Sequence, residues 1–137
     1  MRLLDRLQPV VLLVMRLVLG AIMVAHGYHK VLAGLHHFGQ SVGGPGLSWL
    51  GFVSALAEFF GGLFLFTGFF TRVAALAICI DLMAAIWNVN WQNGLAGDHG
   101  YEFPLAAATL AFALIFLGAG PISLDHALRG GSGASSR

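Results

Sequence analysis

Apolar residues dominate four long runs of this chain, and short polar or glycine-rich stretches separate the runs. The runs cover residues 9–27, 49–70, 73–91 and 103–117. A helix of about 20 apolar residues crosses the hydrocarbon core of a bilayer, and the fourth run approaches this length when its flanks are counted. The pattern therefore predicts four membrane-spanning helices. Thr71 and Arg72 would form a tight connection between the second and the third.

Three of the runs carry an ionisable residue well inside: Arg16 in the first, Glu58 in the second and Asp81 in the third. A charge at the centre of a bilayer costs at least about 2.5–3.5 kcal/mol, so such groups must face one another or a wet cavity. On each helix the charged position shares its face with small residues, which let membrane helices approach closely. We therefore expect an all-α protein, an antiparallel bundle of four transmembrane helices with a longer outer loop between the first two.

The basic residues indicate how such a bundle is oriented. Four spans place both termini on one side, and the arginines at that face are Arg2, Arg6, Arg72, Arg129 and Arg137. Lys30 alone falls at the other face, so the positive-inside rule makes the arginine face cytoplasmic. Aromatic residues that prefer a membrane interface then gather at the outer side, namely Trp49, Trp87, Trp91 and Tyr101.

The two ends of the chain differ in composition from the apolar runs between them. Pro9 is well placed to begin the first helix, because the N–H that proline lacks has no partner in a first turn anyway. The first run resembles a signal peptide, but Arg16 interrupts it and three more spans follow, so we interpret it as a retained anchor. Residues 1–126 are expected to form one domain, and residues 127–137, rich in glycine and serine, a flexible cytoplasmic tail.

Composition agrees with a membrane environment. Hydrophobic residues make up 58% of the chain, charged residues 9%, and the mean hydropathy is +0.82. A net charge of +1 with scattered basic residues argues against a nucleic-acid partner. The single cysteine, Cys79, excludes a disulfide or a Cys-x-x-Cys pair within this chain, and we interpret it as a small buried apolar residue.

Depth along the helices suggests one pairing of charges. Arg16 and Asp81 each lie about 10–12 Å from the cytoplasmic ends of their expected helices, at 1.5 Å of rise per residue. We therefore predict a buried Arg16–Asp81 ion pair in the inner half of the bundle. Such a pair could also serve only to fix the first helix against the third.

The outer half is where the sequence concentrates candidate functional groups. The residues that can reach this end are His26, Lys30, Glu58, Asn88, Tyr101 and Glu102. Polar groups next to aromatic walls could hold the head and ring of a ligand such as a quinone, and histidine with carboxylate could relay protons. The alternative is that Lys30 pairs with Glu58 or Glu102 and that the asparagines cap helix ends.

Other motifs give weaker indications. His36 and His37 are adjacent, so their rings point apart, and we expect no metal site there. The segment Gly43-Gly44-Pro45-Gly46 is a turn, because it lacks the lysine and hydroxyl of a phosphate-binding loop.

Short motifs in a fixed order carry a family resemblance. They are Arg16-Leu17-Val18-Leu19-Gly20, His26-Gly27-Tyr28-His29-Lys30, Ala57-Glu58-Phe59-Phe60-Gly61-Gly62 with Gly68, Thr71-Arg72, Asn93-Gly94, Gly100-Tyr101-Glu102-Phe103, Leu117-Gly118-Ala119-Gly120 and Ser123-Leu124-Asp125. Together they resemble the DoxX family of small bacterial membrane proteins, over about residues 16–125. Asp81 does not correspond to a position of the family pattern.

The resemblance implies a multi-pass protein of the bacterial inner membrane. Some members are subunits of a thiosulfate:quinone oxidoreductase, and others are linked to membrane redox or thiol-stress complexes. The positions of this chain that match the family pattern are Arg16, His26, Lys30, Glu58, Arg72, Tyr101 and Glu102. No catalytic role is attached to them.

Three functions are compatible with these observations. The first is an accessory or quinone-interacting subunit of a membrane oxidoreductase, which would receive electrons from a membrane or peripheral redox partner. The second is a membrane scaffold or assembly protein without redox chemistry. The third, small-solute transport, has less support, because four short spans enclose little room unless they form a homo-oligomer.

Overall fold

The computed structural model describes residues 2–32, 48–96 and 98–131, and every regular element in these residues is helical. The α-helices are α1 (Arg2–Leu32), α3 (Ser48–Thr67), α4 (Thr71–Ala85), α5 (Glu102–Leu117) and α6 (Leu124–Gly131). A π-helical turn, η1 (Ile86–Asn90), and a 3₁₀ turn, η2 (Trp91–Asn93), extend α4. The all-α prediction holds for this part of the chain.

Helix α1 begins earlier than the sequence predicted. It starts at Arg2, and Pro9 lies inside it. A proline inside a helix removes one backbone hydrogen bond, but the preceding residues are mostly good helix formers. Asp5 also lies in the first turn, where a negative charge interacts favourably with the helix dipole. The helix therefore continues through the proline.

The connection between α3 and α4 is tight, as expected, but it uses other residues. α3 ends at Thr67 and Thr71 already begins α4, so the turn consists of residues 68–70. Gly68 has φ +72° and Phe70 has φ +46°. A left-handed conformation is cheap for glycine but strained for phenylalanine, so other contacts must hold this turn.

The C-terminal region is more ordered than predicted. Residues 127–131, which were assigned to a flexible tail, belong to α6. The rest of that tail, residues 132–137, lies outside the described part of the chain, as do His36, His37 and residues 43–46.

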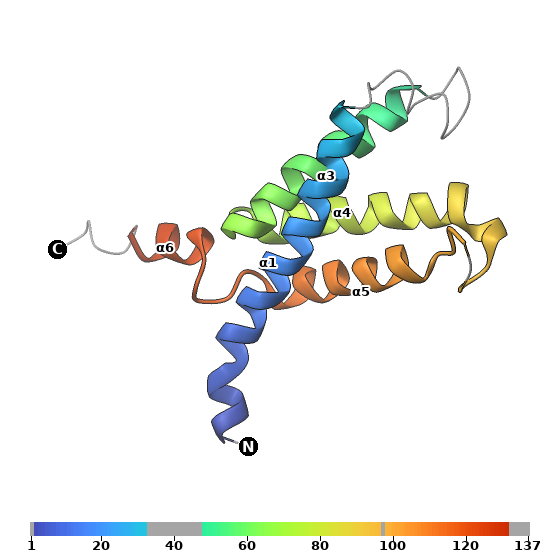
Figure 1. Ribbon diagram of the computed structural model, residues 1–137. Helices are drawn as coiled ribbons and strands as arrows, with labels where there is room; N and C mark the ends of the chain where they lie inside the picture. Colours follow the sequence, from blue (N-terminus) through green and yellow to red (C-terminus); the bar gives the residue numbers. More distant parts are fainter. Residues whose placement is uncertain (1, 33–47, 97, 132–137) are drawn as a thin grey trace.

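The helices form two antiparallel pairs. α1 packs along α3, α4 packs along α5, and α3 also contacts α4, for example where Gly61 lies beside Ile78. In Figure 1 the α1/α3 pair runs obliquely across the α4/α5 pair, and α6 extends away beside the α3–α4 turn. The order of the chain thus brings the end of α3, the start of α4 and the segment after α5 to one end of the molecule.

Small side chains fill much of the interior, while bulky ones face outward. Alanines 74, 75, 107, 108 and 111 are buried where α4 meets α5. Large apolar side chains such as Phe64, Phe112 and Ile80 are exposed. Cys79 is part of this packing and its Sγ lies 3.8 Å from the carbonyl oxygen of Ala108. An apolar exterior around a core of small residues is what a lipid-facing protein requires.

Length and hydropathy identify two helical segments that can cross a membrane, Asp5–Leu32 and Thr71–Asn93. Two further apolar helical segments are shorter, Gly51–Thr67 and Glu102–Leu117. The two long segments belong to different pairs, and each packs against one of the shorter segments.

Glycines bring α1 and α3 into backbone contact. A Cβ added to Gly27 would lie 2.5 Å from the backbone nitrogen of Phe59, and one added to Gly62 would lie 2.7 Å from that of Val24. A Cβ on Gly20 would lie 2.7 Å from the carbonyl oxygen of Gly62. These glycines set the distance between the two helices.

We predict that Gly27→Ala lowers the stability of the protein by about 1–3 kcal/mol, the usual cost of overpacking, because α1 and α3 must separate. Thermal unfolding in detergent, followed by circular dichroism, measures this. Gly130→Ala is the matched control, because nothing lies within 4 Å of a Cβ there. Equal melting of the two variants would show that the close approach is not required.

Candidate functional site

Arg16 lies in the interior and bonds to backbone carbonyls. Its side chain is 1% exposed. Its Nε donates to the carbonyl oxygen of Leu65 at 3.2 Å, and its Nη1 donates to those of Ile122 at 3.0 Å and Ala119. The last carbonyls of a helix lack partners within it, and Leu65 lies in the last turn of α3. Arg16 therefore joins α1 to the end of α3 and to the segment after α5.

The predicted Arg16–Asp81 ion pair is wrong. Lys30–Glu58 is the ion pair that the described residues form, and Arg16 has the carbonyl partners given above. The prediction placed both residues at equal depth, whereas Arg16 lies level with the α3–α4 turn. Asp81 lies ten residues beyond Thr71, the first residue of α4, or about 15 Å further along.

Asp125 holds the strained α3–α4 turn from a distant part of the chain. Its Oδ1 accepts from the N–H of Phe70 at 2.8 Å and its Oδ2 from that of Thr71 at 3.0 Å. Its own N–H donates to the carbonyl oxygen of Gly68 at 2.9 Å. A carboxylate at the start of α4 satisfies free N–H groups and interacts favourably with the helix dipole. Asp125 also attracts Arg16 electrostatically.

A hollow of about 560 Å³ opens beside this turn, between the end of α5 and α6. Its lining includes the basic side chains Arg72, His126 and Arg129 together with Asp125. Arg72 also donates from Nη2 to the carbonyl oxygen of Phe116 at 3.3 Å. The sequence analysis did not identify this hollow as a site, although Arg72 and Asp125 belong to the motifs quoted there.

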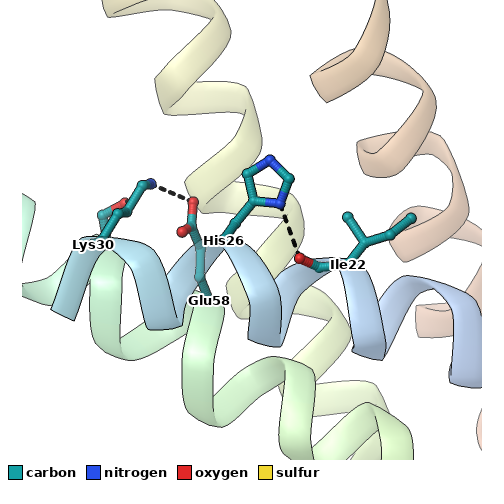
Figure 2. Close-up of polar contacts among 5 residues, drawn as sticks. Ile22, His26, Lys30 and Glu58 are labelled. Atoms are coloured by element: carbon teal, nitrogen blue, oxygen red, sulfur yellow. Dashed lines mark hydrogen bonds and ion pairs between the residues drawn. The ribbon is translucent and has the colours of Figure 1, made fainter. Parts of the chain in front are cut away.

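Lys30 of α1 and Glu58 of α3 form an ion pair on the side of Arg16 that is away from the α3–α4 turn. Lys30 Nζ lies 2.5 Å from Glu58 Oε1 and donates to Ser54 Oγ at 3.4 Å. The Glu58 residue is 4% exposed. Figure 2 shows the ammonium of Lys30 directed at the Glu58 carboxylate, which reaches toward it from α3. The alternative that paired Lys30 with Glu58 is therefore confirmed.

Asp81 adds a second carboxylate to this pair. Its side chain interacts with Ser54 and Glu58, and it is attracted electrostatically by Lys30. One oxygen of each acid, Glu58 Oε2 and Asp81 Oδ2, is buried without a hydrogen-bond partner in the described structure. Buried polar atoms without partners are uncommon in proteins and call for an explanation. We call Lys30, Ser54, Glu58 and Asp81 the polar cluster.

His26 lies one helical turn before Lys30 on α1. Its Nδ1 lies 2.9 Å from the carbonyl oxygen of Ile22, which can only accept, so Nδ1 carries the proton. Its ring stacks on that of Phe103 at the start of α5, with centroids 5.3 Å apart. In Figure 2 the His26 ring and the Lys30 and Glu58 head groups extend to the same side of α1.

The structure does not gather the other expected residues around these groups. Asn88 donates from Nδ2 to the carbonyl oxygen of Ala84 on its own helix, at 2.8 Å. Tyr101 stacks on Trp91 at 5.7 Å. Glu102 is an exposed residue in the first turn of α5. His26, Lys30 and Glu58 therefore remain together, whereas Asn88, Tyr101 and Glu102 have separate surroundings.

A second hollow, of about 430 Å³, is an apolar groove between α3 and α4. Its walls include Val53 and Phe60 from α3 and Ala74 and Ala77 from α4. Val53 precedes Ser54, and Ala77 lies one helical turn before Asp81. None of the four residues of the polar cluster lines the groove itself.

Within residues 2–32, 48–96 and 98–131, no group of three or more His, Cys, Asp or Glu side chains is arranged to hold a metal ion.

Residues 11–91 match the sequence profile of the DoxX family. The chain belongs to the DoxX family. The matched segment contains Arg16, the polar cluster and the α3–α4 turn, whereas Asp125 lies beyond it. Apolar helices together with this membership identify a membrane protein.

Two curated proteins are similar to this DoxX-family chain. One, from Bacillus subtilis (strain 168), is named "Putative oxidoreductase CatD"; it is 29% identical over 104 residues, which cover 74% of this chain and 76% of that protein. The other, from Haemophilus influenzae Rd, carries the name "Uncharacterized protein" and is 28% identical over 134 residues, 90% of this chain and 94% of that protein. No solved structure matches the chain significantly.

We predict that Asp125→Ala destabilises the protein by about 1–2 kcal/mol, because the two N–H groups at the start of α4 lose their acceptor. Thermal unfolding in detergent measures the loss. The control is Asp98→Ala, which removes an exposed acid. If both variants melt like the wild type, Asp125 does not stabilise the turn.

Proposed function

We propose that the chain crosses the bacterial inner membrane four times, with both termini in the cytoplasm. α3 is 20 residues long and spans about 30 Å, the thickness of a hydrocarbon core, and α5 with 16 residues spans about 24 Å. Each is antiparallel to one of the two long segments. The arginines at the α3–α4 end support a cytoplasmic position for that end.

The proposed activity is that of an accessory subunit of a membrane oxidoreductase that binds a quinone beside the polar cluster. The observation that carries this proposal is the pair of buried carboxylate oxygens without partners in an otherwise apolar molecule. The reduced form of a quinone, a quinol, has two hydroxyl groups that could donate to them. His26 and Lys30 add further polar groups on the same side of α1.

The apolar groove supports a ligand with a hydrophobic tail. We propose that a ligand with its polar head at the cluster places its tail along the groove, beside Val53 and Ala77. Binding pockets commonly combine apolar walls with a few polar groups that fix orientation. A quinone with an isoprenoid tail has this combination of properties.

Electrons would pass to or from a partner protein. Cys79 is the only cysteine of the chain, so a redox-active cysteine pair within it is excluded. The name of the Bacillus subtilis relative supports a role in oxidation and reduction. The proposed partner is a redox protein that lies in the membrane or on its surface. The chain itself lies in the lipid bilayer, and we propose a homo-oligomer as a further assembly.

A scaffold function is the second candidate, and the basic hollow favours it. The hollow beside Arg72 and Arg129 lies at the end proposed to face the cytoplasm, where a peripheral protein could dock. In this case the polar cluster would serve folding alone. Loss of Glu58 would then weaken partner capture without affecting any ligand.

The topology predicts which side of the membrane each end faces. In a Cys79→Ser background, a cysteine introduced at Asp98 should react with an impermeant maleimide in intact spheroplasts. A cysteine introduced at Arg129 should react only after permeabilisation. Labelling of both positions from outside would contradict four spans.

The quinone proposal predicts saturable quenching of tryptophan fluorescence when the reduced form, a short-tailed quinol, is added to the purified protein. Glu58→Gln should weaken binding about tenfold, equal to about 1.4 kcal/mol, because the ligand loses a charged acceptor. Asp98→Asn is the control and should titrate like the wild type. A linear, unsaturable response in the wild type, or an unchanged titration of Glu58→Gln, would refute the quinone site.

A further inference from the structure

The polar cluster holds two carboxyl groups, those of Glu58 and Asp81, and one cation, Lys30. The two side chains interact electrostatically, and Glu58 Oε2 and Asp81 Oδ2 are both buried without a hydrogen-bond partner in the described structure. An ionised carboxylate can only accept, whereas a protonated one can also donate. We propose that Glu58 and Asp81 form a proton-binding site that holds one exchangeable proton between them.

The charges of the polar cluster support one proton rather than none or two. Two ionised carboxylates and one ammonium carry a net charge of −1, and uncompensated charge in an apolar interior is costly. One added proton makes the cluster neutral while Lys30 keeps its ion pair with Glu58 Oε1. A second proton would remove the charge that Lys30 pairs with.

A proton fits this place better than a metal cation does. The ammonium of Lys30 lies 2.5 Å from Glu58 Oε1 and repels a second cation. Calcium and magnesium require six or more oxygen ligands or ordered waters, and the part of the chain described here offers two acids and Ser54. A proton needs only the two carboxylate oxygens.

The neighbouring helices supply the other titratable groups around this site. On α1 these are Lys30 and His26, and the exposed His26 is the group through which a proton could exchange with the exterior. On α4, Cys79 faces the carbonyl oxygen of Ala108 instead. On α5, Glu102 is exposed near Phe103, the ring on which His26 stacks.

The proton site does not depend on a quinone. It follows from the arrangement of the polar cluster, and it would exist in a scaffold protein as well. Its test therefore uses the purified full-length chain in lipid nanodiscs without added quinone, so that a failed quinone titration leaves the result unaffected.

Infrared spectroscopy detects the carbonyl stretch of a protonated carboxylic acid directly. The wild type should show a band that shifts in deuterium oxide and disappears as the pH is raised. Glu58→Gln and Asp81→Asn should each abolish this band, because either variant leaves one carboxylate paired with Lys30 and no need for a proton. Asp98→Asn should retain it.

Lys30→Met supplies the opposite test. Without the ammonium, both acids become neutral by binding protons, so the band should roughly double in area. A merely structural cluster of ionised groups would show no such band in either protein. The absence of a protonated carboxyl band from the wild type, or its persistence in both carboxamide variants, would overturn the proposal.

A second measurement applies if a carboxamide variant fails to fold. Dicyclohexylcarbodiimide reacts with protonated carboxyl groups in apolar surroundings, and mass spectrometry locates the adduct. Labelling of the wild type at Glu58 or Asp81 that declines with rising pH would support the proton site. Labelling absent from both acids would refute it.

Discussion

Charged groups inside an apolar molecule must find partners within the molecule, and this constraint accounts for the main contacts of the fold. Arg16 meets it with three backbone carbonyls, and Glu58 meets it with Lys30. Both solutions join α1 to α3, whose glycines already bring their backbones together. The same pair of helices therefore carries the glycine contacts and both Arg16 and Lys30.

The charged groups at the two ends of the α1/α3 pair have different kinds of partner. Near the α3–α4 turn, Arg16 and Asp125 satisfy backbone groups that the helix ends leave open, which is a structural role. Near Lys30, side chains face side chains and two carboxylate oxygens remain without partners. Buried acceptors without donors lower the stability of the fold. For this reason the proposed ligand site lies near Lys30 and not near the α3–α4 turn.

Hydropathy alone predicted the helices well, because the apolar runs are long and their interruptions are short. The prediction of which residues pair depended on where each helix begins and ends. Because α1 begins at Arg2 and the α3–α4 turn lies at residues 68–70, Arg16 is not at the same depth as Asp81. The Lys30–Glu58 pair was recognised as an alternative because both residues lie toward the same end of adjacent helices. Asp125 was missed, since a cap supplied from 54 residues away leaves no local pattern at α4.

The late position of Asp125 has a consequence for biosynthesis. The turn between α3 and α4 obtains its acceptors, and Arg16 obtains two of its three carbonyls, from residues near the C-terminus. When a nascent chain has emerged only as far as α4, Arg16 and the strained turn do not yet have these partners beside them. Residues 119–125 can complete these contacts only after α5 has emerged.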